Sequence, residues 1–198
     1  MKPSNRCSKR TDDVIMDAFI SLVKKKGFKR VTVKDILENA HVNRSTFYRY
    51  YLDKFDLLDK LENQLLAGLR EIENSVAFDL VIKDGITSET RKDTEKFIKY
   101  MYENGELFAL LTNDPCCGSG FISKSKEAIK NLWNEKDFFS QLAVPQIYAM
   151  DALINTANGI IFDWAKNGFR ESPEEFIEIY IKVIGAIPQN IFKNTKNP

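Results

Sequence analysis

The chain has 198 residues, of which 43% are hydrophobic and 29% charged, so it is long enough to bury a core and has the composition of a globular protein. No apolar run approaches the roughly 20 residues of a membrane helix, and the polar N-terminus lacks the apolar stretch of a signal peptide, so we expect a cytoplasmic protein. Three cysteines (Cys7, Cys116 and Cys117) and one histidine (His41) form neither a disulfide framework nor a zinc-ligand spacing, and we expect no metal or cofactor.

Charge is unevenly distributed along the chain, although the formal net charge is only +1. Residues 1–60 hold fourteen basic and eight acidic residues, for a net charge of +6, whereas residues 61–198 carry a net charge of −5. A basic first third on an acidic remainder is typical of a nucleic-acid-binding head on a separate body, although chance clustering on a solvated face gives the same pattern. We expect two domains, at residues 1–60 and 61–198.

The first predicted element follows a polar, basic segment, residues 1–10, that we expect to be a mobile arm. Apolar residues then recur every three or four positions from Val14 to Val23, which is the period of one helix face. Thr11 is a suitable N-cap for this helix, and Gly27 is a natural stop after three lysines.

Two short helices are predicted next, separated by a tight turn. Thr32 followed three residues later by Asp35 is the pattern of a helix N-terminal cap. The turn comprises His41, Val42 and Asn43, and either Asn43 or Ser45 can cap the second short helix, which continues to Tyr51. Two short helices joined in this way form a helix-turn-helix, in which the second helix enters the DNA major groove.

The rest of the chain is also predicted to be helical, so the fold class is all-α. Asp53 can cap a helix that continues through Leu57 and Leu69, and no segment has a trustworthy strand period. Further helical stretches are expected at residues 94–111, 122–142, 146–167 and 173–187, with interruptions at 113–115 and 117–120, closure at Pro188 and a frayed tail over 190–198.

Residues suited to DNA contact cluster in the second short helix. Arg44, Ser45 and Thr46 stand at its N-terminus, where they can donate to base edges or phosphate oxygens. Tyr48 can offer its hydroxyl to a phosphate, whereas Phe47 is expected to anchor the helix in the core. Charge and free backbone N–H groups at the start of the next helix, near Lys54, also favour an anion.

Three segments together resemble the DNA-binding domain of the TetR family of bacterial regulators: Thr32–Ile36, Ala40–Tyr51 and Asp53–Leu58. The resemblance covers about Thr11 to Leu61, with the departure that His41 stands where relatives commonly have glycine. It implies an all-helical homodimer that places one recognition helix in each of two successive major grooves of a near-palindromic operator. It further implies DNA contacts by Thr32, Lys34, Arg44, Ser45, Thr46, Tyr48, Tyr50 and Lys54.

The C-terminal body follows the family in outline, which implies an effector pocket between the middle helices and dimerisation through the last two. Pocket candidates are aromatic or large apolar residues, although such a stripe is more often core: Phe97, Tyr100, Met101, Phe108, Phe121, Trp133 and Phe162. Dimer candidates lie on the last two helices, and the alternative to dimerisation is that they pack inside one protomer: Ala149, Leu153, Ala157, Ile160, Ile161, Trp164, Ile177, Tyr180 and Ile184.

The expected function is therefore that of a DNA-binding repressor released from its operator by a small molecule. An activator of the same fold, or a regulator controlled by a protein partner, remains an alternative. The chain has no glycine-rich phosphate loop, Cys/His nucleophile pair or metal constellation, so we expect no enzyme. A structural helical protein without DNA affinity is the simplest alternative, and steeply salt-dependent duplex binding would exclude it.

Overall fold

The structure is a computed structural model that describes residues 10–82, 88–135, 138–186 and 191–192, so the expected arm, except Arg10, and most of the expected tail lie outside the described residues. Among the described residues, the regular secondary structure is helical, and the one β feature is an isolated bridge between Leu142 and Phe192. The helices are α1 (Thr11–Lys26), α2 (Val33–Ala40), α3 (Arg44–Tyr50), α4 (Lys54–Ile82), α5 (Ser88–Glu103), α6 (Gly105–Asn113), α7 (Pro115–Glu135), α8 (Gln146–Lys166) and α9 (Pro173–Ala186), with 3₁₀ turns η1 (Phe28–Arg30) and η2 (Phe138–Gln141).

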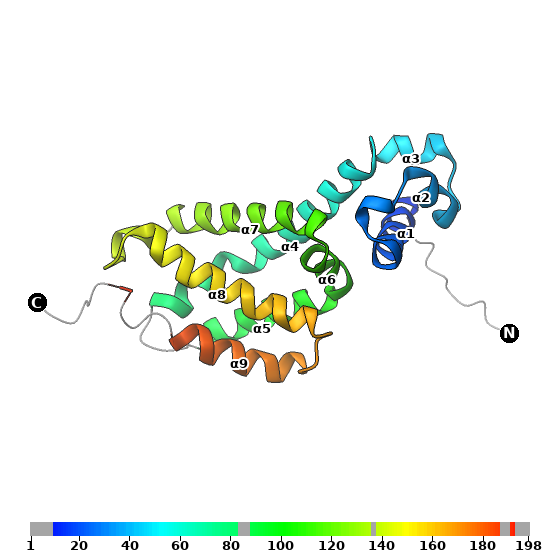
Figure 1. Cartoon of the computed structure of the whole chain (residues 1–198). Helices are drawn as coiled ribbons and strands as arrows, with labels where there is room; N and C mark the ends of the chain where they lie inside the picture. Colours follow the sequence, from blue (N-terminus) through cyan, green and yellow to red (C-terminus); the bar gives the residue numbers. More distant parts are fainter. Residues whose placement is uncertain (1–9, 83–87, 136–137, 187–190, 193–198) are drawn as a thin grey trace, which may run out of the picture.

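The molecule has a small head, formed by α1, α2 and α3, at one end of a larger body of α5 to α9 (Figure 1). Helix α4 begins in the head and continues into the body, where it packs against α5, α7 and α9 (Figure 1). It runs through residues 60 and 61 without a break, so the expected domain boundary falls inside a helix and stays a prediction.

The head has its own apolar core, which the two short helices need because neither is long enough to be stable alone. Phe19 of α1, Ile36 of α2 and Phe47 of α3 are each 0% exposed. Helix α1 begins at Thr11, with Arg10 as N-cap, whereas the sequence indicated Thr11 itself. The carboxylate of Asp13 accepts the Arg10 N–H at 3.3 Å, which moves the cap one residue earlier.

Two interruptions in the body differ from the sequence prediction. The helix expected over residues 94–111 is broken at Asn104, between α5 and α6. The next residue has to be small, because a Cβ at Gly105 would lie 2.8 Å from the ring of Phe169. Conversely, the break expected at 117–120 lies inside α7. Gly120 faces the buried carboxylate of Glu62, which accepts from Lys124 Nζ at 2.7 Å and so ties α7 to α4.

Candidate nucleic-acid interface

The two short helices are fixed by side-chain caps at their N-termini. Thr32 and Asp35 form the expected capping box: the Thr32 N–H donates to Asp35 Oδ2 at 2.7 Å and the Asp35 N–H to Thr32 Oγ1 at 3.2 Å. Asn43 caps α3, because its Oδ1 accepts the Thr46 N–H at 2.8 Å. The caps predicted at Thr32 and Asn43 are therefore confirmed.

The turn between these helices depends on a left-handed residue. His41 ends α2 with φ 53° and ψ 40°, a conformation in which glycine is the usual residue and histidine one of the more tolerated exceptions. The next N–H, that of Val42, donates to the carbonyl of Leu37 at 3.2 Å, which satisfies the end of α2. The turn predicted at His41 is confirmed.

Helix α3 has an exposed face of polar side chains and an opposite face that is buried in the head. Arg44, Ser45 and Tyr48 are exposed, whereas Phe47 is fully buried and Thr46 is half-buried. The guanidinium carbon of Arg44 lies 5.4 Å from the centre of the Tyr48 ring, so the two side chains support each other at the surface. This pair gives α3 a preorganised cationic and aromatic face.

The remaining contact candidates on α2 and α3 differ in how exposed they are and in whether their polar groups already have partners. Lys34 is exposed, with its Nζ 3.8 Å from Glu38 Oε1 one turn along α2. Thr32 is exposed, but its hydroxyl donates to Asp35 Oδ2 at 2.6 Å. Tyr50 is half-buried against the ring of Tyr51, at a centroid distance of 6.3 Å.

Lys54 points into the protein, which differs from the expected phosphate contact. Its ammonium donates to the carbonyl oxygens of Phe28 at 3.0 Å, Lys29 at 3.2 Å and Val31 at 2.8 Å. An ammonium has three donors, so these bonds occupy all of them. The helix start itself is as predicted, since Asp53 Oδ1 accepts the N–H groups of Phe55 and Asp56.

Two contacts that hold the end of α3 were not predicted from the sequence. Lys60 Nζ donates to the carbonyl of Tyr50 at 2.5 Å and lies 4.9 Å from the ring centre of Tyr51. The Tyr51 hydroxyl donates to the carboxylate of Asp12 in α1. Burial, followed by that hydrogen bond, raises the pKa of the Tyr51 phenol. The signal in the sequence that could have indicated the second bond is the tyrosine itself, because a tyrosine in a core position usually has a hydrogen-bond partner for its hydroxyl.

The pocket candidates of the body lie largely in its core. Phe108 contacts both Phe121 of α7, at a centroid distance of 6.0 Å, and Phe162 of α8, at 5.6 Å. Tyr100 and Phe162 are half-buried. The other candidates are at most 8% exposed: Phe97, Met101, Phe108, Phe121 and Trp133.

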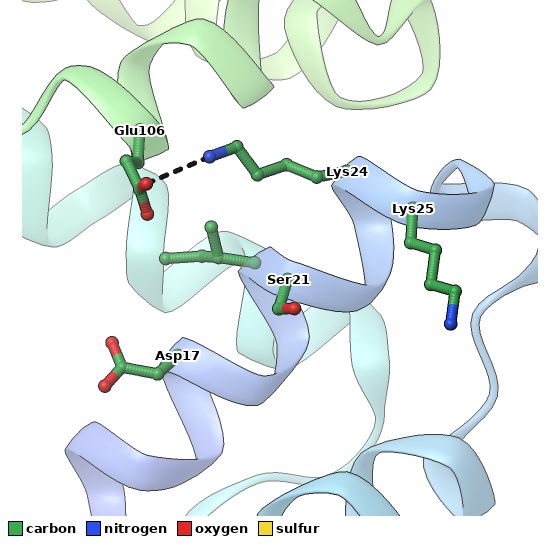
Figure 2. Close-up of a pocket in the computed structure, with 6 residues that line it drawn as sticks. Asp17, Ser21, Lys24, Lys25 and Glu106 are labelled. Atoms are coloured by element: carbon green, nitrogen blue, oxygen red, sulfur yellow. Dashed lines mark ion pairs between the residues drawn. The ribbon is translucent and has the colours of Figure 1, made fainter.

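The described grooves lie elsewhere, on either side of the contact between α1 and α6. Figure 2 shows the groove along α1, in which Lys24 forms a 3.1 Å ion pair with Glu106. Its lining is mostly polar: Asp17, Ile20, Ser21, Lys24, Lys25 and Glu106. The second groove shares Lys24 and ends at Gly27 and Asp114. None of the expected aromatic pocket residues lines either groove.

Most of the dimer candidates are buried within the protomer itself. Of the nine, only Ala157 and Ile160 are half-buried, and the other seven are at most 6% exposed: Ala149, Leu153, Ile161, Trp164, Ile177, Tyr180 and Ile184. For example, the Trp164 ring stacks on Phe176 at 4.0 Å between α8 and α9. The exposed apolar side chains on these two helices are others, Ile147, Tyr148, Ile179 and Val183.

Two classes of site are absent from the residues that the structure describes. No group of three or more His, Cys, Asp or Glu side chains is placed to hold a metal ion there. Among the same residues, no helix has the length and hydropathy needed to cross a membrane.

Comparisons with known proteins agree with this geometry. A family model described as bacterial regulatory proteins of the tetR family matches residues 15–61, and one described as a transcriptional regulator C-terminal region matches residues 89–185. Two relatives from Bacillus subtilis (strain 168), YxbF and YvkB, bear the description uncharacterized HTH-type transcriptional regulator. YxbF is 24% identical over 101 residues, 50% of this chain and 26% of its own length. YvkB is 28% identical over 117 residues, 57% of this chain and 58% of its own length.

The match thus spans less than two thirds of the length of each of these relatives. Among solved structures, a TetR transcriptional regulator from Streptococcus agalactiae 2603V has a TM-score of 0.60 at 22% identity, covering 88% of this chain and 93% of its own. That likeness concerns the fold alone. Together, the two family models and the capped helix-turn-helix show that the chain belongs to the TetR family of DNA-binding transcriptional regulators.

Proposed function

We propose that the chain is a homodimeric repressor that binds a near-palindromic operator through α3 and is released by a small-molecule effector. The observation that supports this most directly is the exposed face of α3. Arg44 and Tyr48 stack on each other there, next to the hydroxyl of Ser45. Arginine and hydroxyl side chains at the start of a recognition helix are suited to base edges and phosphates in the major groove.

The proposed DNA contacts are those whose polar groups can reach a duplex from this face. Arg44, Ser45 and Tyr48 form its centre, and Lys34 on α2 contributes a cation that is 84% exposed. Thr32, Thr46 and Tyr50 border this face. Lys54 is omitted from the set because its three donors are bound to backbone carbonyls.

The proposed dimer interface is the outward face of α8 and α9. Ile147 and Tyr148 on α8 are 65% and 67% exposed, and Ile179 and Val183 on α9 are 42% and 39% exposed. A Cβ added at Gly159 would have nothing within 4 Å, so this position leaves room on α8 for close approach. Two half-sites one helical turn apart require such a pairing of heads.

The proposed effector site lies among the aromatic rings of Phe108, Phe121 and Phe162, which join α6, α7 and α8. Ligand pockets of this class are lined mainly by apolar and aromatic side chains. The half-buried Phe162 and Tyr100 are the positions in the candidate set through which a ligand would gain access.

The experiment that tests DNA binding starts with the full-length chain and a random-sequence duplex library. Selected duplexes are expected to contain an inverted repeat, and their affinity to fall steeply with salt because phosphate contacts release counterions. Arg44→Ala should change the selected sequence at one position of each half-site and weaken binding roughly 5- to 150-fold per half-site, the range of one bidentate base contact. Arg170→Ala, which removes the same charge from an exposed position of the body, is the matched control and should change neither.

Transcription in vitro from a genomic fragment that carries the selected site then tests repression. Added protein is expected to lower the transcript, and a small molecule that dissociates the complex is expected to restore it. A rise in transcript with added protein would exclude repression while leaving DNA binding intact. Failure of the wild-type chain to enrich any duplex would contradict the proposal as a whole.

A further inference from the structure

The 3₁₀ turn η1, which connects α1 to α2 in the head, is bonded to the body. The N–H of Phe28 donates to Asp114 Oδ2 at 2.9 Å, across 86 positions of sequence. Asp114 lies between α6 and α7, where its other oxygen, Oδ1, accepts the Cys116 N–H at 2.9 Å. One carboxylate therefore caps α7 and also holds the head.

The same turn is bonded on its carbonyl side to the start of α4. Lys54 Nζ, which carries only donors, bonds to the carbonyls of Phe28, Lys29 and Val31. The ammonium also lies 4.6 Å from the centre of the Phe28 ring, which is only 4% exposed. The turn is thus held by the body through its N–H and by α4 through its carbonyls.

We infer that Asp114 and Lys54 are positioning residues for DNA binding, which act through η1 to set the angle at which α3 is held relative to the body. The inference rests on the proposed function. A part-buried hydrogen bond to a carboxylate is stronger than a neutral one. The Lys24–Glu106 ion pair also joins the head to the body, between α1 and α6, but its side chains are 46% and 80% exposed and it therefore contributes little.

The angle matters because a dimer has to place two recognition helices in grooves about 34 Å apart. A head that swivels can still bind one half-site, since its own contacts are intact. A dimer with such heads loses affinity for two half-sites at a fixed spacing, because fewer of the orientations of its heads place both recognition helices in their grooves. A positioning role is therefore distinguished from a DNA contact by comparing duplexes with two half-sites and with one.

Asp114→Asn tests the bond to the body with the least disturbance of the cap. The retained Oδ1 can still accept the Cys116 N–H, whereas an NH₂ group replaces the oxygen that accepts from Phe28. On the duplex selected by the wild-type chain, we expect affinity to fall about tenfold, as for one lost charged hydrogen bond. Two further duplexes complete the test. Affinity for a duplex in which one half-site is scrambled should be unchanged. When the spacer between the half-sites is altered by one base pair, the variant should lose less affinity than the wild type does.

Glu106→Gln is the matched control, since it breaks an exposed ion pair of the same head–body contact and should leave all three affinities unchanged. Asp114→Asn with wild-type affinity on both duplexes, or with an equal loss on both, would overturn the inference. A wild-type chain that selects no duplex would instead refute the proposed function, so the two failures are distinguishable.

Lys54→Met tests the second residue, because methionine keeps an unbranched apolar stem but removes the ammonium. We expect the same selective loss on two half-sites, with an unchanged slope of log affinity against log salt. A slope smaller in magnitude by about 1.8, which is about 0.9 for one phosphate contact in each of the two protomers, would overturn the positioning role. If Lys54→Met does not fold, Lys54→Arg decides the matter: a phosphate contact would tolerate it, whereas three converging carbonyls require an ammonium and should show the selective loss.

Discussion

Asp35 is the residue of the head at which the largest number of local contacts meet in one carboxylate. Its Oδ2 accepts from the Thr32 N–H at 2.7 Å and the Thr32 hydroxyl at 2.6 Å, and forms a 2.7 Å ion pair with Lys26 Nζ. Asp35→Asn keeps the size of the side chain and removes its charge. The substitution therefore weakens the start of α2 and its tie to the end of α1 together.

The expected loss can be summed from these contacts. Weakening a helix cap costs about 1 kcal/mol, and an ion pair whose partners are both 29% exposed contributes roughly 0.5 kcal/mol. We expect the free energy of unfolding at pH 7 to fall by about 1.5 kcal/mol, which for a chain of this size lowers the melting temperature by roughly 3–6 °C. Urea unfolding followed by circular dichroism measures this difference.

The difference between the two proteins should depend on pH. The hydrogen bond from Lys26, followed by those from Thr32, holds the pKa of the Asp35 carboxyl well below its ordinary value of 3.8. Because the folded pKa is lowered, the stabilisation is fully present above pH 3.8 and declines as the pH falls below it, by up to about 1.4 kcal/mol per pH unit. The advantage of the wild type should thus be measurably smaller at pH 3 than at pH 7, and it should disappear only as the pH falls through the lowered pKa.

A difference in unfolding free energy that stays constant between pH 7 and pH 3 would refute this reasoning, because it would show that the charge of Asp35 is not what stabilises the head. Glu38→Gln is the matched control. Its carboxylate lies 3.8 Å from Lys34 Nζ, and the two side chains are 67% and 84% exposed, so no measurable change is expected at either pH.

Three further outcomes follow from single positions. His41→Gly should raise the free energy of unfolding by roughly 0.5–1 kcal/mol, since φ 53° strains a residue with a Cβ, and a lower melting temperature would contradict this. Iodoacetamide at pH 8 should label Cys116 and spare Cys117, because burial raises the pKa of the Cys117 thiol to about 12; equal labelling by mass spectrometry would contradict the burial. Gly68→Ala should destabilise by roughly 1–3 kcal/mol in urea, because its Cβ would clash with the Tyr100 hydroxyl, and wild-type stability would show that the ring can move.

The head could be predicted from the sequence because its defining interactions are local. The caps at Thr32 and Asn43 each join residues three positions apart, and the left-handed residue His41 follows directly on α2. The spacing of such residues therefore fixes the ends of the helices. The burial of Phe47 likewise follows from the period of a short amphipathic helix.

The features that could not be predicted from the sequence depend on interactions between distant segments. Lys54 stands at a helix start, where a phosphate contact is a reasonable expectation, but the carbonyls that bind its ammonium lie 23 to 26 residues earlier and converge only in the fold. Gly105 reads as an ordinary helix residue until Phe169 is placed against it.

The body shows the same limit for its apolar faces. Periodicity marks an apolar helix face without showing whether a neighbouring helix or a second protomer covers it. Trp164 and Tyr180 belong to faces that the protomer covers itself, whereas Tyr148 and Ile179 remain exposed. The difference depends on how α8 and α9 pack, which no single helix specifies.

Helix α3 has only seven residues, and different positions in it are buried and exposed. Phe47 is inaccessible and holds the helix in place, while Arg44, Ser45 and Tyr48 face outward. Exposed substitutions usually change stability by less than about 0.5 kcal/mol. Under the proposed function, exchanging the outward positions by evolution or by design would therefore change the DNA preference while the head stays folded.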